Sequence, residues 1–182
     1  SYEVGAVSAD VAIGGVRVNI IPKEGGNTFS GSAFGNWSNS SLQGDNLSSA
    51  LKAQGVQSAD TLDLIYDTSY DLGGPVVQDK LWFHAAFRAW GLEFLPSNTF
   101  YDTDPNPFVF TPGTEKGVDE NYNASTSLRL TAQATEQNKF SVYFNHAFRH
   151  LPHTSISSIT TPQASRDQRN PLNYHGTATW TG

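Results

Sequence analysis

Cysteine and methionine are both absent from this chain, and charged residues make up only 15% of its 182 residues. The lack of cysteine excludes disulfides and thiolate metal sites. The lack of methionine leaves no start residue, so we expect a processed, internal or excised chain. Soluble domains usually carry about 25% charged residues, and the low charge here is atypical of them. A net charge of -6 argues against nucleic acid as a partner.

Long apolar runs and catalytic signatures are missing as well. No run approaches the roughly 18 apolar residues of a transmembrane helix, which excludes helical spanning and leaves strand spanning open. The sequence contains no phosphate loop, dinucleotide fingerprint, zinc-protease helix or nucleophile elbow. We therefore assign no catalytic residue and expect no cofactor, and an enzyme is the less favoured class.

The sequence does contain alternating apolar and polar residues, a period of two that predicts β-strands. In residues 122–135 one face carries tyrosine, alanine and leucine, while the other is wholly polar. We predict about six long strands after residue 27 and a short one at 16–21. The other alternating stretches are 29–37, 62–72, 81–90, 140–145 and 174–180.

The predicted connections alternate between long and short. The long ones are residues 39–61, 95–121 and 151–172, and the short ones are 73–79 and 135–138. Long loops at one end and short turns at the other are typical of outer-membrane barrels. Residues 46–56, inside the first long loop, are the only segment that looks helical, with Asn46 or Ser48 as a cap.

The strand expected at 79–94 raises the question of which face is covered. Its apolar face would be inside in a soluble sandwich and outside, against lipid, in a membrane barrel. At about 3.3 Å per residue it reaches roughly 50 Å, more than a membrane crossing needs. The apolar face carries Leu81, Phe83, Ala85, Phe87 and Ala89, and the other face carries Trp82, His84, Arg88 and Trp90.

Three stretches resemble TonB-dependent outer-membrane receptors. Residues 14–37, GGVRVNIIPKEGGNTFSGSAFGNW, are similar to the junction between plug and barrel. Residues 71–87, DLGGPVVQDKLWFHAAF, resemble the first periplasmic hairpin, and residues 129–149 resemble the second. The most similar subgroup is the large receptors that carry a carboxypeptidase-regulatory-like domain ahead of the plug.

The resemblance implies an all-β fold, an antiparallel up-and-down meander of about six long strands belonging to an outer-membrane β-barrel. A stand-alone chain would instead close into a small barrel. Residues 1–27 would be the end of the plug domain and its linker, and 28–182 the first barrel strands and loops. Family members are far longer, so the chain would be a segment of one.

The resemblance also implies a function in transport. The parent would lie in the outer membrane of a Gram-negative bacterium and import a large nutrient, such as an oligosaccharide, peptide or chelate. Its partners would be the rest of its own barrel and plug, membrane lipid and an energy-coupling protein, with no nucleic acid. The alternative is a stand-alone β-rich hydrolase or carbohydrate-binding protein derived from such a fragment.

The candidate binding residues follow from this arrangement. The residues expected to line the lumen and guide a substrate weakly are Asp63, Asp67, Asp71, Trp82, His84, Arg88, Arg129 and Gln133. The aromatic residues of the long loops either stack on sugar or peptide ligands or pack the loops, and they are Phe100, Tyr101, Phe108 and Phe110. Trp37, Trp90 and Trp180 suit the aromatic girdles of a barrel.

Two patterns resemble metal sites, and we expect neither to hold one. His146 and His150 share a strand face about 13 Å apart, too far for one ion at Zn–N distances near 2 Å. Asp102 and Asp104 alternate as in a calcium loop, but prolines replace the flexible spacing, and a solvated loop is favoured over calcium. His153 completes the histidine pattern.

Carboxylates recur on the strand at 62–72. Asp63, Asp67 and Asp71 share a face with neighbours about 13 Å apart, whereas paired glycosidase carboxylates lie about 5–9.5 Å apart. A cross-strand partner such as Glu93 would be needed for a catalytic pair, and a polar lumen wall is the favoured interpretation.

Overall fold

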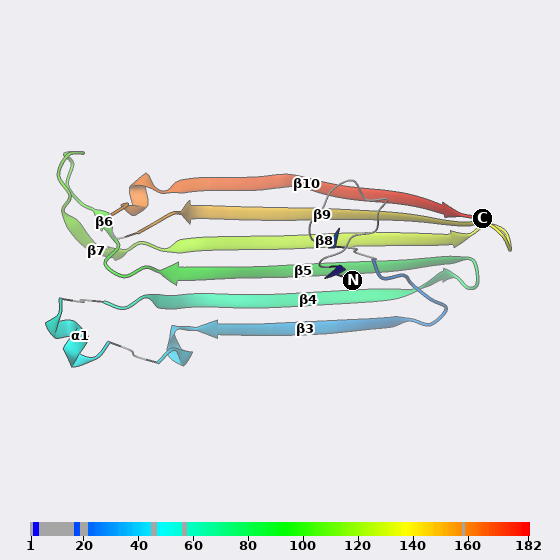
Figure 1. The fold of residues 1–182 in the computed structure, drawn as a ribbon, viewed down its shortest axis with the longest axis horizontal. Coiled ribbons are helices and arrows are strands. Elements are labelled where there is room, and N and C mark those ends of the chain that lie inside the picture. The colour runs from blue at the N-terminus through cyan, green and yellow to red at the C-terminus, as the bar shows by residue number, and fades with distance from the viewer. Residues whose placement is uncertain (1, 4–16, 19–21, 45–46, 56–57, 158) are drawn as a thin grey trace.

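A six-stranded antiparallel sheet forms the body of the chain, in the order β10-β9-β8-β5-β4-β3. The computed structural model describes residues 2–3, 17–18, 22–44, 47–55, 58–157 and 159–182. The long strands that follow one another along the chain are neighbours in the sheet, so it is an up-and-down meander (Figure 1). The all-β prediction is confirmed. The sheet is open, with β3 and β10 as its edges, so the small closed barrel is not formed.

The long strands all run between the two ends of the sheet. They are β3 (Ser30–Asn39), β4 (Thr61–Val77), β5 (Leu81–Leu95), β8 (Asp119–Gln133), β9 (Lys139–Thr154) and β10 (Arg166–Thr181). The three long loops gather at one end and the two short turns at the other (Figure 1). The predicted alternation of connections is thus confirmed.

The remaining elements are short. β1 (Tyr2–Glu3) pairs with β2 (Arg17–Val18), which lies within the strand expected at 16–21; residues 16 and 19–21 lie outside the described residues. β6 (Phe100–Asp102) and β7 (Pro112–Lys116) form a hairpin inside the second long loop that the sequence analysis missed. Two 3-10 turns are η1 (Ser40–Leu42) and η2 (Pro162–Ala164).

The predicted helix is present but shorter than expected. α1 (Ser49–Ala53) begins after Ser48, whose hydroxyl accepts a hydrogen bond from the Leu51 N–H at 3.3 Å. The Ser48 cap is confirmed, and Asn46 lies outside the described residues.

The first short turn is tighter than its Gly-Gly-Pro sequence suggests, because Gly73, Gly74 and Pro75 remain within β4. The turn itself occupies 78–80, and Asp79 adopts a left-handed conformation with φ of 62°. Gly74 lies under the ring of Phe29, and a Cβ at position 74 would come within 2.3 Å of that ring. The glycines therefore allow close packing within a strand rather than forming the turn.

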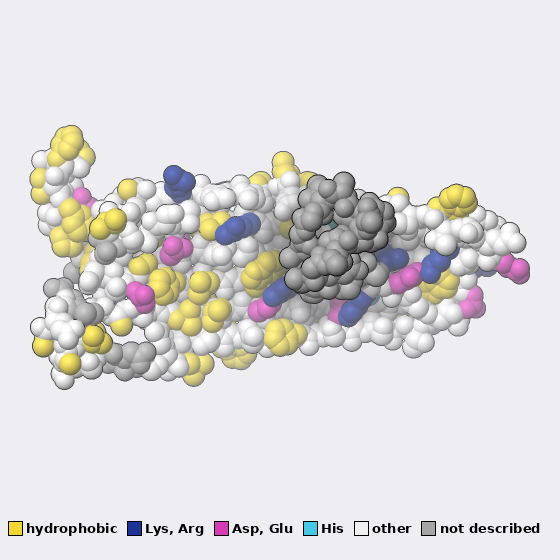
Figure 2. All heavy atoms as spheres, in the orientation of Figure 1, with side chains coloured by type: hydrophobic (Ala, Val, Ile, Leu, Met, Phe, Trp, Pro, Cys, Tyr) yellow, Lys and Arg dark blue, Asp and Glu magenta, His cyan; other side chains and the backbone are white. Residues whose placement is uncertain are grey.

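Pairing register gives the sheet two different faces. The apolar face carries the rows Leu72–Ala85–Leu128–Phe144 and Gly74–Phe83–Leu130–Val142. The polar face carries the rows Asp71–Ala86–Ser127–Asn145 and Gly73–His84–Arg129–Tyr143. Charged side chains gather along the middle and the short-turn end of the polar face (Figure 2).

The apolar face is uncovered along most of its length. Trp37 is 73% exposed and Trp180 is 66% exposed. Among the described residues, the buried hydrophobic side chains are Leu151 and Ile156, so the sheet is a single layer without a two-sided core. The other exposed side chains of this face are Tyr70, Leu72, Phe87, Leu128, Leu130, Phe140, Val142, Phe144 and Tyr174.

Candidate functional site

The linker segment, which we define as residues 22–27, lies against the polar face just before β3 begins. Arg129 of β8 donates from Nη1 to the Pro22 carbonyl at 2.6 Å. At the other end of the segment, Trp82 of β5 donates from Nε1 to the Asn27 side-chain oxygen at 2.7 Å. Segments more than 50 residues apart in sequence therefore meet on this face.

An ion pair and a histidine–carboxylate hydrogen bond connect β4 and β5 beside the linker segment, on what we call the polar wall. Arg88 binds Asp67 through two parallel hydrogen bonds of 2.9 and 2.7 Å, and its guanidinium lies 4.7 Å from the ring centroid of Trp90. Asp71 accepts from His84 at 3.3 Å and has the Lys23 ammonium 3.6 Å away. Each cation of this wall is thus matched by a carboxylate.

A cavity of about 320 Å³ lies between the start of the linker segment and this wall. Its lining mixes cations, a carboxylate and hydroxyl groups, with Lys23, Asp71, His84, Arg88, Ser125 and Tyr143 among its members. Such a lining suits hydrated polar molecules, because it offers donors and acceptors in many directions.

Six of the eight residues predicted to line a lumen take part in this polar wall. They are Asp67, Asp71, Trp82, His84, Arg88 and Arg129. Gln133 turns back onto its own turn, donating to the Thr135 carbonyl at 2.7 Å. Asp63 is exposed and is the extra residue where the pairing of β4 and β5 shifts.

Glu93 does not complete a carboxylate pair with the aspartates of β4. It pairs with Glu120, in register with the apolar face and on the opposite side of the sheet from Asp67. Its carboxylate accepts from the Tyr122 hydroxyl at 2.8 Å. A cross-strand pair of Glu93 with Asp67, considered for a glycosidase, is therefore excluded by the register.

Sequence reasoning missed the linker residues Lys23, Glu24 and Asn27, as well as Lys139. Glu24 has the Lys139 ammonium at 2.6 Å and the Arg129 guanidinium at 3.7 Å. Burial raises the pKa of Glu24, but Lys139 and Arg129 outweigh it and leave that pKa below its usual range. These contacts join distant segments, so no local pattern pointed to them.

Aromatic side chains mark both limits of the apolar face. Trp37 and Tyr66 are paired in a row at the long-loop end, and Phe140 and Trp180 in a row at the short-turn end. The positions of Trp37 and Trp180 suit aromatic girdles. The placement of Trp90 in a girdle is wrong, because Trp90 pairs with Asp67 and lies on the polar face.

The 102–111 loop is built from successive side-chain turns. Asp102 accepts from the Asp104 N–H at 3.0 Å and Asp104 from the Asn106 N–H at 2.9 Å. Asn106 accepts in turn from the Phe108 N–H at 3.1 Å. The oxygens considered as calcium ligands thus shape the loop as Asx turns.

The four loop aromatics are not equally available. Phe108 is 94% exposed and Phe110 53%, at the tip of the β6–β7 hairpin. Phe100 and Tyr101 are half-buried at the base of that hairpin. Stacking on a ligand therefore remains a prediction for the tip, while the base residues are partly packed.

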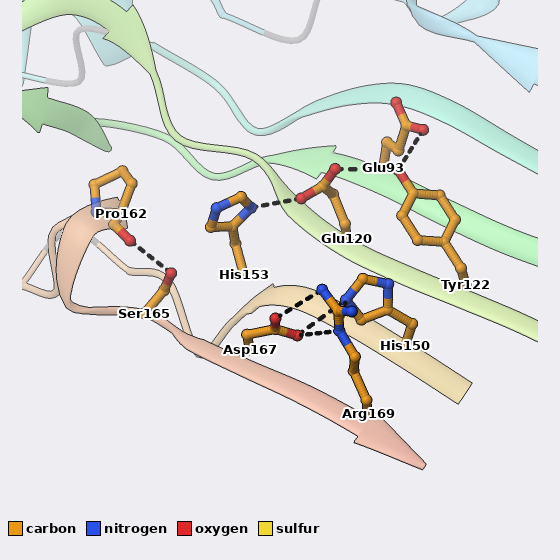
Figure 3. A network of polar contacts seen from close by, with 9 residues as sticks. All are labelled: Glu93, Glu120, Tyr122, His150, His153, Pro162, Ser165, Asp167 and Arg169. Carbon is orange, nitrogen blue, oxygen red and sulfur yellow. Dashed lines mark hydrogen bonds and ion pairs between the residues drawn. The ribbon is translucent and has the colours of Figure 1, made fainter. Parts of the chain in front are cut away.

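The three histidines of the pattern at 146–153 each have a protein partner along β9. His146 donates to the Pro171 carbonyl at 2.7 Å. His150 and His153 bind Asp167 and Glu120, at 2.9 and 2.5 Å (Figure 3). Within the described part of the chain, no group of histidine and carboxylate side chains is arranged to hold a metal ion.

None of the helices in the described ranges is long and apolar enough to cross a membrane. Comparison with curated proteins finds a similar one, the TonB-dependent transporter Oar of Myxococcus xanthus. It is 36% identical to this chain over 74 residues, a match that covers 41% of the chain and 7% of the relative. No family model and no solved structure matches.

Proposed function

We propose that this chain is a segment of a TonB-dependent outer-membrane receptor, in which the apolar face of the sheet meets lipid and the polar face lines the barrel interior. The observation that carries the proposal is the uncovered apolar face. Monomeric soluble proteins rarely expose contiguous apolar patches larger than a few hundred Å². A face of this kind needs a cover, and lipid is an apolar solvent for it.

The height of the apolar face supports this placement. Along β5 it runs from Leu81 to Gly91, about 33 Å at 3.3 Å per residue. Barrel strands tilt by about 40°, which reduces the height along the membrane normal to about 25 Å, the height of the apolar band of outer-membrane barrels. The aromatic rows at its two limits lie where girdles are expected.

The polar face and the two open edges support the same arrangement. The linker segment lies on the polar face, as the end of a plug within a barrel would. Bare sheet edges cannot lie in lipid, so β3 and β10 would pair with the remaining strands of the same receptor. The similarity to the Myxococcus transporter agrees with a segment of a much longer protein.

The parent would import a large nutrient such as an oligosaccharide, peptide or chelate, powered through an energy-coupling protein. Residues 1–27 would be the end of the plug and its linker, and 28–182 the first part of the barrel. The polar wall around Asp67, Asp71, His84 and Arg88 would hydrate the path and guide the substrate by weak contacts. The exposed Phe108 and Phe110 would meet it at the outer surface.

Lipid contact can be tested with single cysteines, because these 182 residues contain none and any cysteine elsewhere in the full-length protein is first replaced by serine. Leu128→Cys and Ser127→Cys place a fluorophore on adjacent residues of β8 that face opposite sides. In vesicles that contain the full-length protein, spin-labelled lipid should quench the label at 128 and leave the label at 127 largely unquenched. Equal quenching at the two positions would contradict the proposal.

A further inference from the structure

Arg129 connects the beginning of the linker segment to the sheet, and each of its three guanidinium nitrogens has a partner. Nε donates to the Ser141 hydroxyl at 2.9 Å, which fixes the side chain to the wall of β9. Nη1 donates to the Pro22 carbonyl at 2.6 Å, and Nη2 lies 3.7 Å from the Glu24 carboxylate. The side chain is only 16% exposed, so this charge depends on its partners.

Glu24 connects the linker segment to a second strand. Its carboxylate lies between Arg129 of β8 and Lys139 of β9, the latter at 2.6 Å. Charge-assisted contacts to two strands resist displacement more than one neutral hydrogen bond would.

Gly25 allows the backbone to lie directly on the sheet. A Cβ at this position would be 2.2 Å from the Phe83 carbonyl oxygen of β5, whereas one at Gly26 would meet nothing within 4 Å. The Cα of Gly25 lies 3.6 Å from where a Cβ on Gly73 of β4 would be. Only a residue without a side chain fits here, because the obstructing atoms belong to the backbone.

Asn27 fixes the other end of the segment to the tight turn between β4 and β5. Its side-chain oxygen accepts from the Asp79 N–H at 3.0 Å and from the Trp82 indole at 2.7 Å. Its amide nitrogen donates to the Asp79 carboxylate. The left-handed conformation of Asp79 is therefore supported by a residue 52 positions earlier.

We propose that the linker segment is a fixed anchor, which stays bound to the sheet along its whole length, and that the ion pairs of Glu24 hold it there. The contacts to β4, β5, β8 and β9 are distributed along the whole segment, so displacing it would break them together. The role of this anchor in a receptor rests on the proposed function, in which the segment joins the plug to the barrel.

The anchor predicts that a label on the segment is immobile and that removing the Glu24 charge frees it. Gly26→Cys offers an open position for a nitroxide in a chain without other cysteines. In the full-length protein, Glu24→Gln should shorten the rotational correlation time of this label by about threefold or more. Lys139→Gln, which leaves the Arg129 pair, should give a smaller change in the same direction.

Glu136→Gln is the matched control. It removes the same charge from the 134–138 turn, where Glu136 is exposed and has no ion-pair partner among the described residues. Gly25→Ala tests the anchor through packing rather than charge and should also mobilise the label. A label equally mobile in the Glu24 and Glu136 variants would overturn the proposal.

A second comparison covers a variant that fails to fold. Heat-dependent electrophoretic migration reports whether the barrel is formed. If the Glu24→Gln variant does not form it, the label mobility in Lys139→Gln and Gly25→Ala tests the proposal instead. The proposal would also be overturned if the label at Gly26→Cys, with Glu24 unchanged, were as mobile as a label at Gly44→Cys in the first long loop. Label mobility is independent of lipid quenching at positions 127 and 128, so the anchor and the proposed function can fail separately.

Discussion

The stability cost of replacing Leu128 with arginine tests whether the apolar face of the sheet contacts lipid or water. Leu128 lies in a middle row of the apolar face, between Ala85 of β5 and Phe144 of β9, and is 42% exposed. An arginine near the bilayer midplane destabilises an outer-membrane barrel by about 2–4 kcal/mol, and one near the interface by about 0–1 kcal/mol. In water, an exposed substitution of this kind usually changes stability by less than about 0.5 kcal/mol.

The magnitude can be set against two internal controls. Phe140→Arg introduces the same charge in the row at the short-turn limit of the apolar face, where Phe140 pairs with Trp180. Ser127→Arg introduces it one residue away on the polar face. We expect Leu128→Arg to cost about 2–4 kcal/mol, Phe140→Arg about 1 kcal/mol, and Ser127→Arg less than about 0.5 kcal/mol.

Reversible denaturant unfolding of the full-length protein in lipid vesicles measures these differences. A cost of about 2.8 kcal/mol corresponds to a hundredfold change in the folded-to-unfolded ratio, well above the error of such titrations. Three variants of equal stability would refute lipid contact, because depth in the membrane would then have no effect on the cost of the charge.

Further predictions concern packing, pH and the loop tip. Gly91→Ala should cost about 1–3 kcal/mol in chemical unfolding, because its Cβ would lie 2.6 Å from the Tyr66 ring; Gly44→Ala, with nothing within 4 Å, should be neutral. The Asp104 and Thr111 N–H groups hold the pKa of Asp102 below its usual range. That contribution to loop stability is present above about pH 4 and lost as the pH falls through the lowered pKa. The protection factors of amide protons in the 102–111 loop, which correct for the intrinsic pH dependence of exchange, should therefore fall in acid and stay constant between neutral pH and pH 5. Phe108→Ala should leave unfolding within about 0.5 kcal/mol of the parent and weaken uptake of a stacking ligand, and unchanged uptake would show that the tip does not contact it.

Local pattern was sufficient to locate the long strands, through their period-two alternation. Their order as an up-and-down meander followed from the resemblance to the receptor family, since long loops join three of the five neighbouring pairs. The alternation also placed Leu128 and Arg129 on opposite faces, as the register has them. The predicted strand ends were less accurate. The sequence placed residues 73–75 in a turn, but they remain in β4. Phe29 and Gly25 pack on this part of the strand, and no local stretch of sequence indicates that contact.

The sequence predicted which residues form the polar wall of the candidate site, but not which of them contact one another. Alternation placed Asp67, His84 and Arg88 on the polar face, but which carboxylate pairs with which cation depends on register across two strands. Trp90 illustrates the limit: alternation placed it on the face of His84 and Arg88, its residue type suggested a girdle, and its pairing with Asp67 supports the polar wall.

The sequence by itself determined an all-β meander with one apolar and one polar face, because a strand shows its two faces within a few residues. The tertiary structure alone decided that the sheet is open and that residues 22–27 lie on its polar face. It also decided that Glu24 is held by Arg129 and Lys139. Those contacts join segments up to 115 positions apart, and their formation depends on register and sheet twist rather than on any local pattern.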